Sequence, residues 1–274
     1  MRYPSMANVT APFVVKPKTE PLLNSILAGL LNENRLPPGS IVDAGAFDGS
    51  WALWMAFRWP DRRVHAVDPL ASNVNIIRRQ APSNIRALCA VLGVESTTVF
   101  MDHRAQQHAS KTGYFLTGKG LAHSDNGSMV AVRMRTIDEL FVSDWSGERL
   151  ALLHLDVEGA EREVLRGGTA TLQRDMPIIT VEVHVHLHLS RTRALIRLLL
   201  SSRYEVFLVE EICGMRADCR NLLCVHRGMR RSMRGSDALD MAIASRAMLA
   251  VDQRSILSQA FPCCAHGGEC CRDR

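Results

Sequence analysis

The segment D-A-G-A-F-D-G-S at residues 43–50 combines acidic side chains and glycines directly after a short apolar run. Glycine lets a turn approach a ligand closely and present backbone N–H groups to it. About twenty residues on, the run V-H-A-V ends at Asp68, whose carboxylate could accept both hydroxyls of an adenosine ribose. This pattern is typical of a nucleotide-binding site. Its predicted loop residues are Asp43, Gly45, Asp48 and Gly49.

The loop differs from the G-x-G-x-x-G pattern of dinucleotide sites, because it lacks the second glycine that lies against a pyrophosphate. Asp43 and Asp48 would also repel phosphate groups, so an NAD-dependent oxidoreductase is the weaker interpretation. Two acids suit a cationic ligand such as S-adenosylmethionine, which carries a positive sulfonium and a positive amino group. A tight turn without a ligand would explain the glycines, but not the acids paired with Asp68.

A second group of chemically capable residues follows two later apolar segments. One segment ends at Asp156, within the motif L-D-V-E-G-A-E, and the other carries Glu182 and His184 near its end. A poor nucleophile such as an alcohol needs a general base, and an imidazole with a pKa near 6.5 suits neutral pH. His184 is therefore the first candidate for the base. Asp156 and Glu182 could instead hold Mg²⁺, which prefers oxygen ligands.

Two further groups could bind a metal. His184, His186 and His188 alternate, so an extended strand would place them on one face with Glu182. Histidines at a strand end also commonly line a cleft, so a metal is considered but not predicted. Residues 263–271 read C-C-A-H-G-G-E-C-C, but the spacing of the cysteines is not a repeated C-x₂-C pair.

The remaining sequence alternates apolar strands with amphipathic helices, which predicts a parallel sheet covered on both faces. Two final strands without a helix between them suggest an antiparallel hairpin on the edge of this sheet. Residues 102–130 are polar and are expected to form a long loop. The expected helices are 21–34, 50–59, 72–80, 136–142, 160–167, 193–202 and 237–250. The expected strands are 40–46, 63–67, 85–90, 97–101, 150–157, 178–185, 204–209 and 221–226.

The composition is that of a globular protein, with 274 residues, 47% hydrophobic and 22% charged. No apolar run approaches the roughly 20 residues that cross a bilayer, so no membrane contact is expected. The N-terminus lacks the apolar stretch of a signal peptide, which makes the cytoplasm the expected compartment. The net charge is +5, but the arginines are scattered apart from a cluster at 227–234. Nucleic-acid binding is therefore not expected.

Five motifs together resemble the FkbM family of S-adenosylmethionine-dependent methyltransferases. They are D-A-G-A-F-D-G-S at 43–50, A-V-D-P at 66–69, T-I-D-E-L at 136–140, L-D-V-E-G-A-E at 155–161 and P-I-I-T-V-E-V-H at 177–184. The late strand pair, with Asn221-Leu222-Leu223, is also similar to the family. The resemblance spans residues 38–227 in order. Residues 1–37 are then an N-terminal arm and helix, and residues 228–274 a helical extension with a Cys-rich tail.

The resemblance implies an α/β fold with a Rossmann-like, seven-stranded class I methyltransferase sheet, mostly parallel with an antiparallel C-terminal hairpin. It implies transfer of the cofactor's methyl group to a hydroxyl of a small molecule such as a sugar or polyketide. Asp43, Gly45, Asp48, Gly49 and Asp68 match the family's cofactor positions, and Ala90 falls where an adenine contact is expected. The predicted catalytic residues are His184, Glu182 and Asp156. The alternative is a binding or regulatory protein that keeps the fold without turnover.

Overall fold

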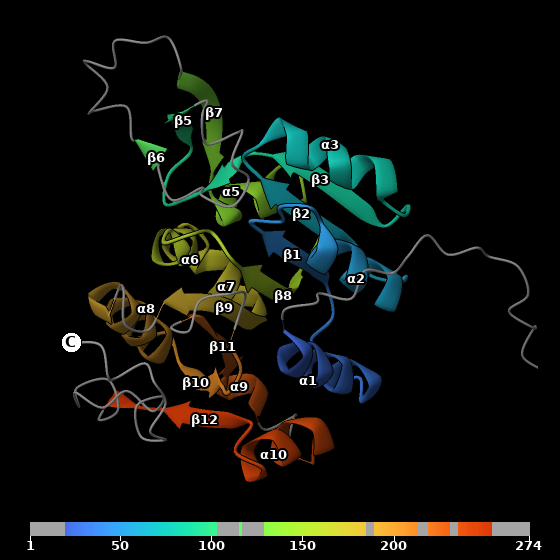
Figure 1. Ribbon diagram of the computed structural model, residues 1–274, viewed down its shortest axis with the longest axis vertical. Helices are drawn as coiled ribbons and strands as arrows, with labels where there is room; N and C mark the ends of the chain where they lie inside the picture. The colour runs from blue at the N-terminus through green and yellow to red at the C-terminus, as the bar shows by residue number, and fades with distance from the viewer. Residues whose placement is uncertain are drawn as a thin grey trace, which may run out of the picture.

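The computed structural model describes residues 20–102, 115–116, 129–184, 189–212, 219–230 and 235–253. These residues form an eight-stranded sheet and a separate four-stranded sheet, with helices on both faces of the larger one (Figure 1). No helix in this part of the chain is long and apolar enough to cross a membrane.

The main sheet has the strand order β12-β10-β11-β9-β8-β1-β2-β3. The strands are β1 (Ser40–Ala44), β2 (Val64–Asp68), β3 (Ile85–Cys89), β8 (Leu150–Leu155), β9 (Ile178–His184), β10 (Tyr204–Val209), β11 (Cys219–His226) and β12 (Met248–Val251). From β3 to β9 all neighbours pair in parallel, and β11 is antiparallel to both β9 and β10. The predicted α/β class, mostly parallel sheet and C-terminal hairpin are confirmed.

The helices cover the sheet in two layers. One face carries α1 (Pro21–Asn32), α2 (Ser50–Arg58), α3 (Ala71–Gln80) and α10 (Asp237–Ala244), and the other carries α5 (Ile137–Val142), α6 (Glu161–Gly167), α7 (Thr169–Asp175) and α8 (Leu189–Ser201). Successive strand residues point to opposite faces, so Ile41 packs in the first layer and Val42 in the second. The apolar runs of the strands follow from this burial on both sides.

The smaller sheet was not expected from the sequence. It has the order β4-β7-β5-β6, with strands β4 (Val91–Leu92), β5 (Thr97–Asp102), β6 (Phe115–Leu116) and β7 (Met129–Arg135). The prediction of an unbroken loop over 102–130 is wrong where β6 and the start of β7 lie. In β7, Val130, Val132 and Met134 alternate with Ala131, Arg133 and Arg135. The first three pack in a hydrophobic cluster with residues of β4 and β5.

The C-terminal part of the described chain extends the main sheet. Residues 248–250 were expected to be helical, but they belong to β12, which pairs antiparallel with β10. The hairpin of β10 and β11 therefore does not form the edge of the sheet, because β12 pairs with the outer side of β10. The apolar run M-L-A-V is too short for a helix of its own and completes the edge instead. Between β11 and α10 lies the short helix α9 (Arg227–Arg230), and α10 ends at Ala244, ahead of β12.

Candidate functional site

The acidic residues singled out in the sequence lie at the carboxyl ends of four strands that are adjacent in the sheet. Asp43 lies near the end of β1, Asp68 ends β2, Asp156 directly follows β8, and Glu182 lies near the end of β9. Since β2, β1, β8 and β9 are neighbours and parallel, these ends meet at one edge. Ligands of open α/β sheets bind outside this edge.

The loop after β1, residues 45–49, has a conformation that most side chains would not adopt. Gly45 and Gly49 have φ angles of +83° and +82°, and Phe47 between them has +47°. A Cβ on Gly45 would lie 1.7 Å from the carbonyl oxygen of Asp156, so the end of β1 touches the backbone after β8. Gly45 is thus required by packing as well as by any ligand. The β1 loop and the region after β8 are therefore in direct contact.

Asp68 holds this loop in place. Its Oδ2 accepts a hydrogen bond from the Phe47 N–H at 2.9 Å, while Oδ1 accepts from the Leu70 N–H at 2.8 Å and from Asn73 Nδ2 at 3.1 Å. Burial raises its pKa, although these three donors oppose the shift. Besides the role predicted from the sequence, Asp68 therefore organises the loop that would surround a ligand.

The other two predicted cofactor residues are Asp48 and Ala90. Asp48 is exposed, and its Oδ1 accepts from the Ser50 N–H at 2.9 Å at the start of α2. Ala90 is buried between β3 and β4, and its N–H donates to the Asp68 carbonyl oxygen at 3.1 Å. The backbone of Ala90 is thus fixed beside the end of β2.

Asp43 is the most unusual carboxyl group of the site. It is 1% exposed, and its Oδ2 has no hydrogen-bond partner among the described residues. Burial raises its pKa to about 7, opposed by a backbone hydrogen bond from Ala52 and reinforced by Asp68, Asp48 and Glu20. A buried carboxyl group among other acids is a place where a cation would be strongly stabilised.

We expect Asp43 to make the unliganded protein less stable as the pH rises from about 4 to about 7. The unfolded chain releases this proton near pH 3.8, whereas the folded state keeps it up to about pH 7. The folded state binds more protons in this window, so the free energy of unfolding falls with rising pH, by on the order of 4 kcal/mol for this shift. Denaturant unfolding at pH 5 and pH 8 measures the decline. It should shrink in Asp43→Asn and persist in Asp48→Asn, whereas equal declines in both variants would contradict the expectation.

The second cluster consists of Asp156, Glu158, Glu182 and His184. His184 Nε2 lies 3.6 Å from Glu182 Oε1, because residues two apart on β9 share a face. Desolvation raises the pKa of Asp156 well above its ordinary value, and the nearby carboxylates of Glu182 and Glu158 add to the shift. Burial and the neighbouring carboxylates therefore favour the protonated form of Asp156, in which the carboxyl group can donate a hydrogen bond.

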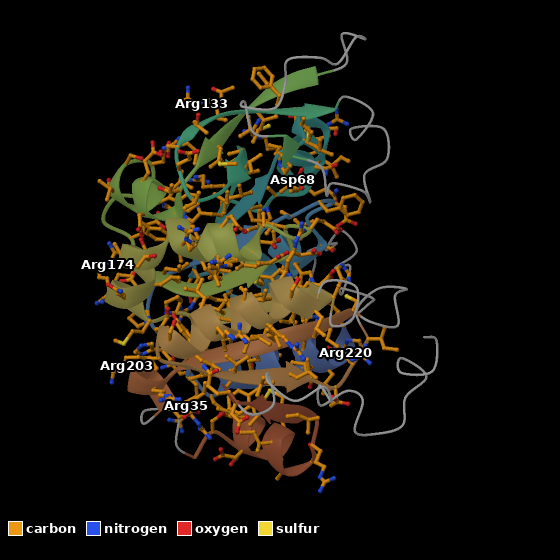
Figure 2. All side chains as sticks on the ribbon, turned by 90° about the vertical axis from the view of Figure 1, so that its left-hand side faces the viewer. Arg35, Asp68, Arg133, Arg174, Arg203 and Arg220 are labelled. Carbon is orange, nitrogen blue, oxygen red and sulfur yellow. The ribbon has the colours of Figure 1, made fainter. Side chains whose placement is uncertain are left out.

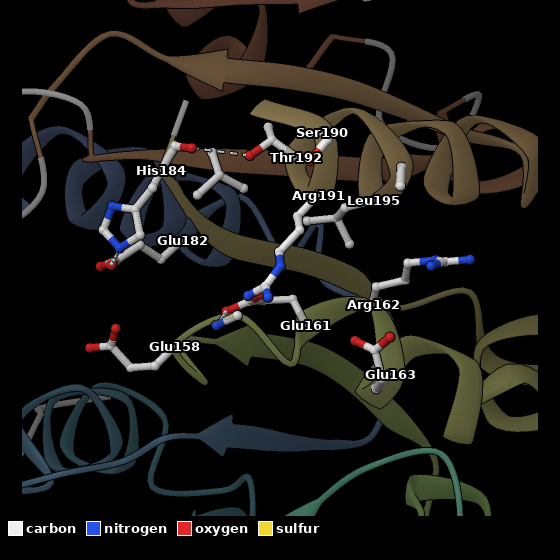
Figure 3. A pocket seen from close by; sticks show the side chains of 13 residues that line it. Glu158, Glu161, Arg162, Glu163, Glu182, His184, Ser190, Arg191, Thr192 and Leu195 are labelled. Carbon is white, nitrogen blue, oxygen red and sulfur yellow. Dashed lines mark hydrogen bonds and ion pairs between the residues drawn. The ribbon is translucent and has the colours of Figure 1, made fainter. Parts of the chain in front are cut away.

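A pocket of about 430 Å³ is lined by Glu158, Glu182 and His184 of this cluster; we call it the Glu182 pocket. It is lined by the loop after β8, the start of α6, the end of β9 and the start of α8 (Figure 3). Figure 3 shows Glu182 and His184 together at one end of it, with Arg191 extending from α8 toward Glu161. Glu158 has a φ angle of +53°, so this loop is also held in a strained conformation.

Among the described residues, six non-glycine residues have a positive φ, and four of them follow the end of a helix, where this conformation is ordinary. The other two are Phe47 and Glu158, which precede α2 and α6 at the ends of β1 and β8. Backbone strain is commonly maintained at functional sites. Its position here supports placing the functional site at these two loops.

The described residues contain one group that could hold a metal ion: Glu182, His184 and Cys219, whose ligand atoms lie within 4.8 Å of one another. Cys219 pairs with His184 across β9 and β11, but its sulfur is disulfide-bonded and is not a thiolate ligand. His186 and His188, and the cysteines of the tail, lie outside the described residues.

The sequence interpretation missed Glu20, which α1 brings to the same site. It is 5% exposed, and its carboxylate accepts from Trp51 Nε1 at 2.7 Å and from Asn221 Nδ2 at 2.6 Å. Burial raises its pKa, and its charge contributes to the raised pKa values of Asp43 and Asp156. No local motif marks this residue, because its partners lie 31 and 201 positions away.

Comparison with known proteins gives a family match. The family model described as "Methyltransferase FkbM domain" matches residues 43–206, which contain all the candidate site residues from Asp43 to His184. A curated relative, "Methyltransferase 1" of Beauveria bassiana, is 30% identical over 142 residues. That match covers 46% of this chain and 57% of the fungal protein, so the chain spans little more than half of the relative's length.

Solved structures of methyltransferases are similar at lower identity. The methyltransferase FkbM of Methylobacillus flagellatus is 17% identical with a TM-score of 0.47, and the match covers 68% of this chain and 43% of that one. Human methyltransferase-like protein 13, in complex with SAH, is 13% identical with a TM-score of 0.41, and the match covers 85% and 94% of the two chains.

Proposed function

The chain belongs to the FkbM family of methyltransferases, and from that premise we propose that it transfers the methyl group of S-adenosylmethionine to a hydroxyl oxygen of a small molecule. The observation that carries the proposal is the contact between Gly45 and the Asp156 carbonyl oxygen. It joins the acidic β1 loop to the Glu182 pocket, so a cation bound at the loop would lie beside a pocket that carries an imidazole and carboxyl groups.

The residues present fit a cationic adenosyl cofactor. The buried Asp43 carboxyl group has an oxygen without a partner among the described residues, and Asp68 and Asp48 add negative charge near it. We assign Asp43, Gly45, Asp48 and Gly49 to the methionyl side of the cofactor, Asp68 to the ribose and the Ala90 backbone to the adenine. When bound, the cofactor supplies an electrophilic methyl group on its sulfonium.

The Glu182 pocket would hold the acceptor. Displacement at a methyl group requires the acceptor oxygen in line with it, so positioning supplies much of the rate. His184 would take the hydroxyl proton at Nε2, and the Glu182 carboxylate 3.6 Å away would stabilise the imidazolium formed. Asp156 lies two residues before Glu158 of the pocket wall, and in its protonated form, which burial favours, it would donate a hydrogen bond that orients the acceptor. We do not include a divalent metal in the proposal: of the ligand group described above only Glu182 and His184 remain, because the Cys219 sulfur is disulfide-bonded.

We place this activity in residues 38–227, with residues 1–37 and 228–274 as flanking segments. Hydrogen bonds between the described parts of the two flanks support this assignment. Glu33 accepts hydrogen bonds from the Ser236 hydroxyl at 2.6 Å and from the Ala238 N–H at 2.7 Å, which fixes the start of α10 against α1. Glu20 is the residue directly before α1, so the C-terminal flank, which packs against α1, helps to position a residue of the site.

The proposal is tested by thermal unfolding with S-adenosylmethionine, S-adenosylhomocysteine or NAD⁺. At a hundredfold excess over Kd, a bound ligand stabilises the folded state by about 2.7 kcal/mol, which raises Tm by roughly 5–10 °C in a chain of this size. We expect this shift with the two adenosyl ligands alone and its loss in Asp68→Ala.

Asn73→Ala is the matched control for Asp68→Ala. It removes one donor to Asp68 but leaves the carboxylate and its bond to the Phe47 N–H, so most of the shift should remain. No shift with any of the three ligands in the wild-type protein would refute the cofactor assignment. It would favour the alternative, a protein that keeps the fold to bind something else.

A further inference from the structure

A second pocket opens at the other end of the strands, where β10 begins and β11 ends. It has a volume of about 430 Å³ and is enclosed by α6, α7 and α8. We call it the Tyr204 pocket and define it by Leu165, Leu172, Leu199, Arg203, Tyr204 and His226. In Figure 2 Arg203 lies on the side of the molecule away from Asp68, so this pocket is separate from the proposed active site.

The floor of the Tyr204 pocket is apolar. Leu165, Leu172 and Leu199 are 3%, 8% and 2% exposed and belong to the core between the sheet and its helices. The pocket has the size of ordinary small-molecule sites, which begin at about 300 Å³. It could therefore enclose an apolar group of several carbon atoms.

The Tyr204 hydroxyl is a buried polar group that lacks a partner. The residue is 1% exposed, and its hydroxyl has no hydrogen-bond partner among the described residues. Burial raises the pKa of this phenol, so it stays protonated and can donate. A buried hydroxyl without a partner is costly and needs an explanation. A polar atom of a ligand in the pocket would supply the missing partner.

Two further donors line the same pocket. His226 Nδ1 accepts from the Gly228 N–H at 3.1 Å, so the proton of the neutral ring lies on Nε2. Burial and the nearby Arg203 lower the pKa of His226, which keeps it neutral at pH 7. Arg203 is exposed on the rim and makes no ion pair within the part of the chain that the structure describes.

The formal charges of the two pockets are opposite in sign. Among the described lining residues, the Glu182 pocket has four glutamates and two arginines, whereas the Tyr204 pocket has one arginine and no acidic residue. A phenol, an imidazole N–H and a guanidinium together suit an anionic acceptor group. We propose that the Tyr204 pocket binds a small molecule with an apolar body and a carboxylate.

Octanoate is a suitable probe, and isothermal titration calorimetry on the full chain measures its binding. We expect one octanoate per chain and at least tenfold weaker binding of octan-1-ol, because the alcohol lacks the charge that Arg203 and its neighbours recognise. Tyr204→Phe should weaken octanoate at least tenfold. The same variant should raise the Tm of the unliganded protein, because it removes a buried hydroxyl without a partner.

Arg203→Gln tests the pocket without altering the hydrophobic core, because the Arg203 side chain is exposed whereas Tyr204 is buried. It should weaken octanoate binding, whereas Arg197→Gln, on the exposed side of α8 and outside both pockets, should not. The inference would be overturned by any of three results: no binding of octanoate to the wild type, binding at several sites per chain, or unchanged affinity in Tyr204→Phe and Arg203→Gln. None of these depends on whether the chain transfers a methyl group.

Discussion

Replacing His184 with alanine is expected to lower kcat by roughly 10²–10⁴, the usual contribution of a general base. The imidazole lies in the Glu182 pocket, 3.6 Å from a carboxylate that would stabilise its protonated form. The fold should tolerate the change, because the Thr192 hydroxyl still donates its hydrogen bond to the backbone carbonyl oxygen of residue 184. The measurement is release of S-adenosylhomocysteine with an acceptor found by screening hydroxylated compounds.

Two variants separate a base from a residue that only lines the pocket. Ser190→Ala alters the wall of the Glu182 pocket without removing a titratable group and should leave kcat within about threefold. Glu182→Gln should shift the acidic limb of the pH profile of kcat, because the imidazolium loses its nearby negative charge. If His184→Ala retains wild-type turnover while Glu182→Gln does not, the base is the carboxylate and the assignment of His184 is wrong.

Gly45→Ala is expected to destabilise the protein by about 4 kcal/mol or more and to abolish cofactor binding. The added Cβ would lie 1.7 Å from the Asp156 carbonyl oxygen, and backbone atoms of two central strands cannot move apart cheaply. The positive φ angle of +83° adds a cost of about 1 kcal/mol. In a chain of this size, a loss of 4 kcal/mol lowers Tm by roughly 8–16 °C.

Gly147→Ala is the matched control, because Gly147 has a similar φ of +80° but nothing within 4 Å of the added Cβ. It should show only the conformational cost, so the difference between the two variants measures the contact between the β1 loop and the region after β8. Equal losses of stability in the two variants would mean that this contact yields easily. The cofactor loop and the acceptor pocket would then not be held against each other as proposed.

The main sheet could be predicted because its signals are local. Strands β1 and β8 are mostly apolar, with Ser40, Asp43 and His154 as the exceptions, and each is followed by a turn and a helix. The rule that ligands bind at the carboxyl ends of parallel strands then places Asp43, Asp68 and Asp156 at one edge. The structure confirms these positions, while the chemical roles of the residues remain predictions.

The features that the sequence did not reveal depend on contacts between distant segments. β7 follows a polar stretch, and its alternation of Val130, Val132 and Met134 gains meaning only beside β5. β12 becomes a strand because β10 offers an unpaired edge, and M-L-A-V alone fits a helix as well. Short apolar runs are ambiguous for this reason.

The site itself shows the same division. Asp68 was expected to face a ligand, but its bonds to the Phe47 and Leu70 amides are visible only in three dimensions. Glu20 reaches the site because Glu211, at the end of β10, accepts the Leu22 and Leu23 N–H groups and fixes the start of α1. No spacing within the sequence could indicate either arrangement.

Helices α6 and α8 each line both pockets. On α6, Glu161 and Glu163 face the Glu182 pocket and Leu165 faces the Tyr204 pocket; on α8, residues 190–195 and 198–201 divide in the same way. Any sliding of either helix therefore reshapes two cavities at once. If a ligand in one pocket selects a helix position, the affinity of the other pocket changes, and the reciprocity of binding equilibria makes the factor the same in both directions. Two ligands that do not contact each other would then change each other's affinity through the positions of α6 and α8.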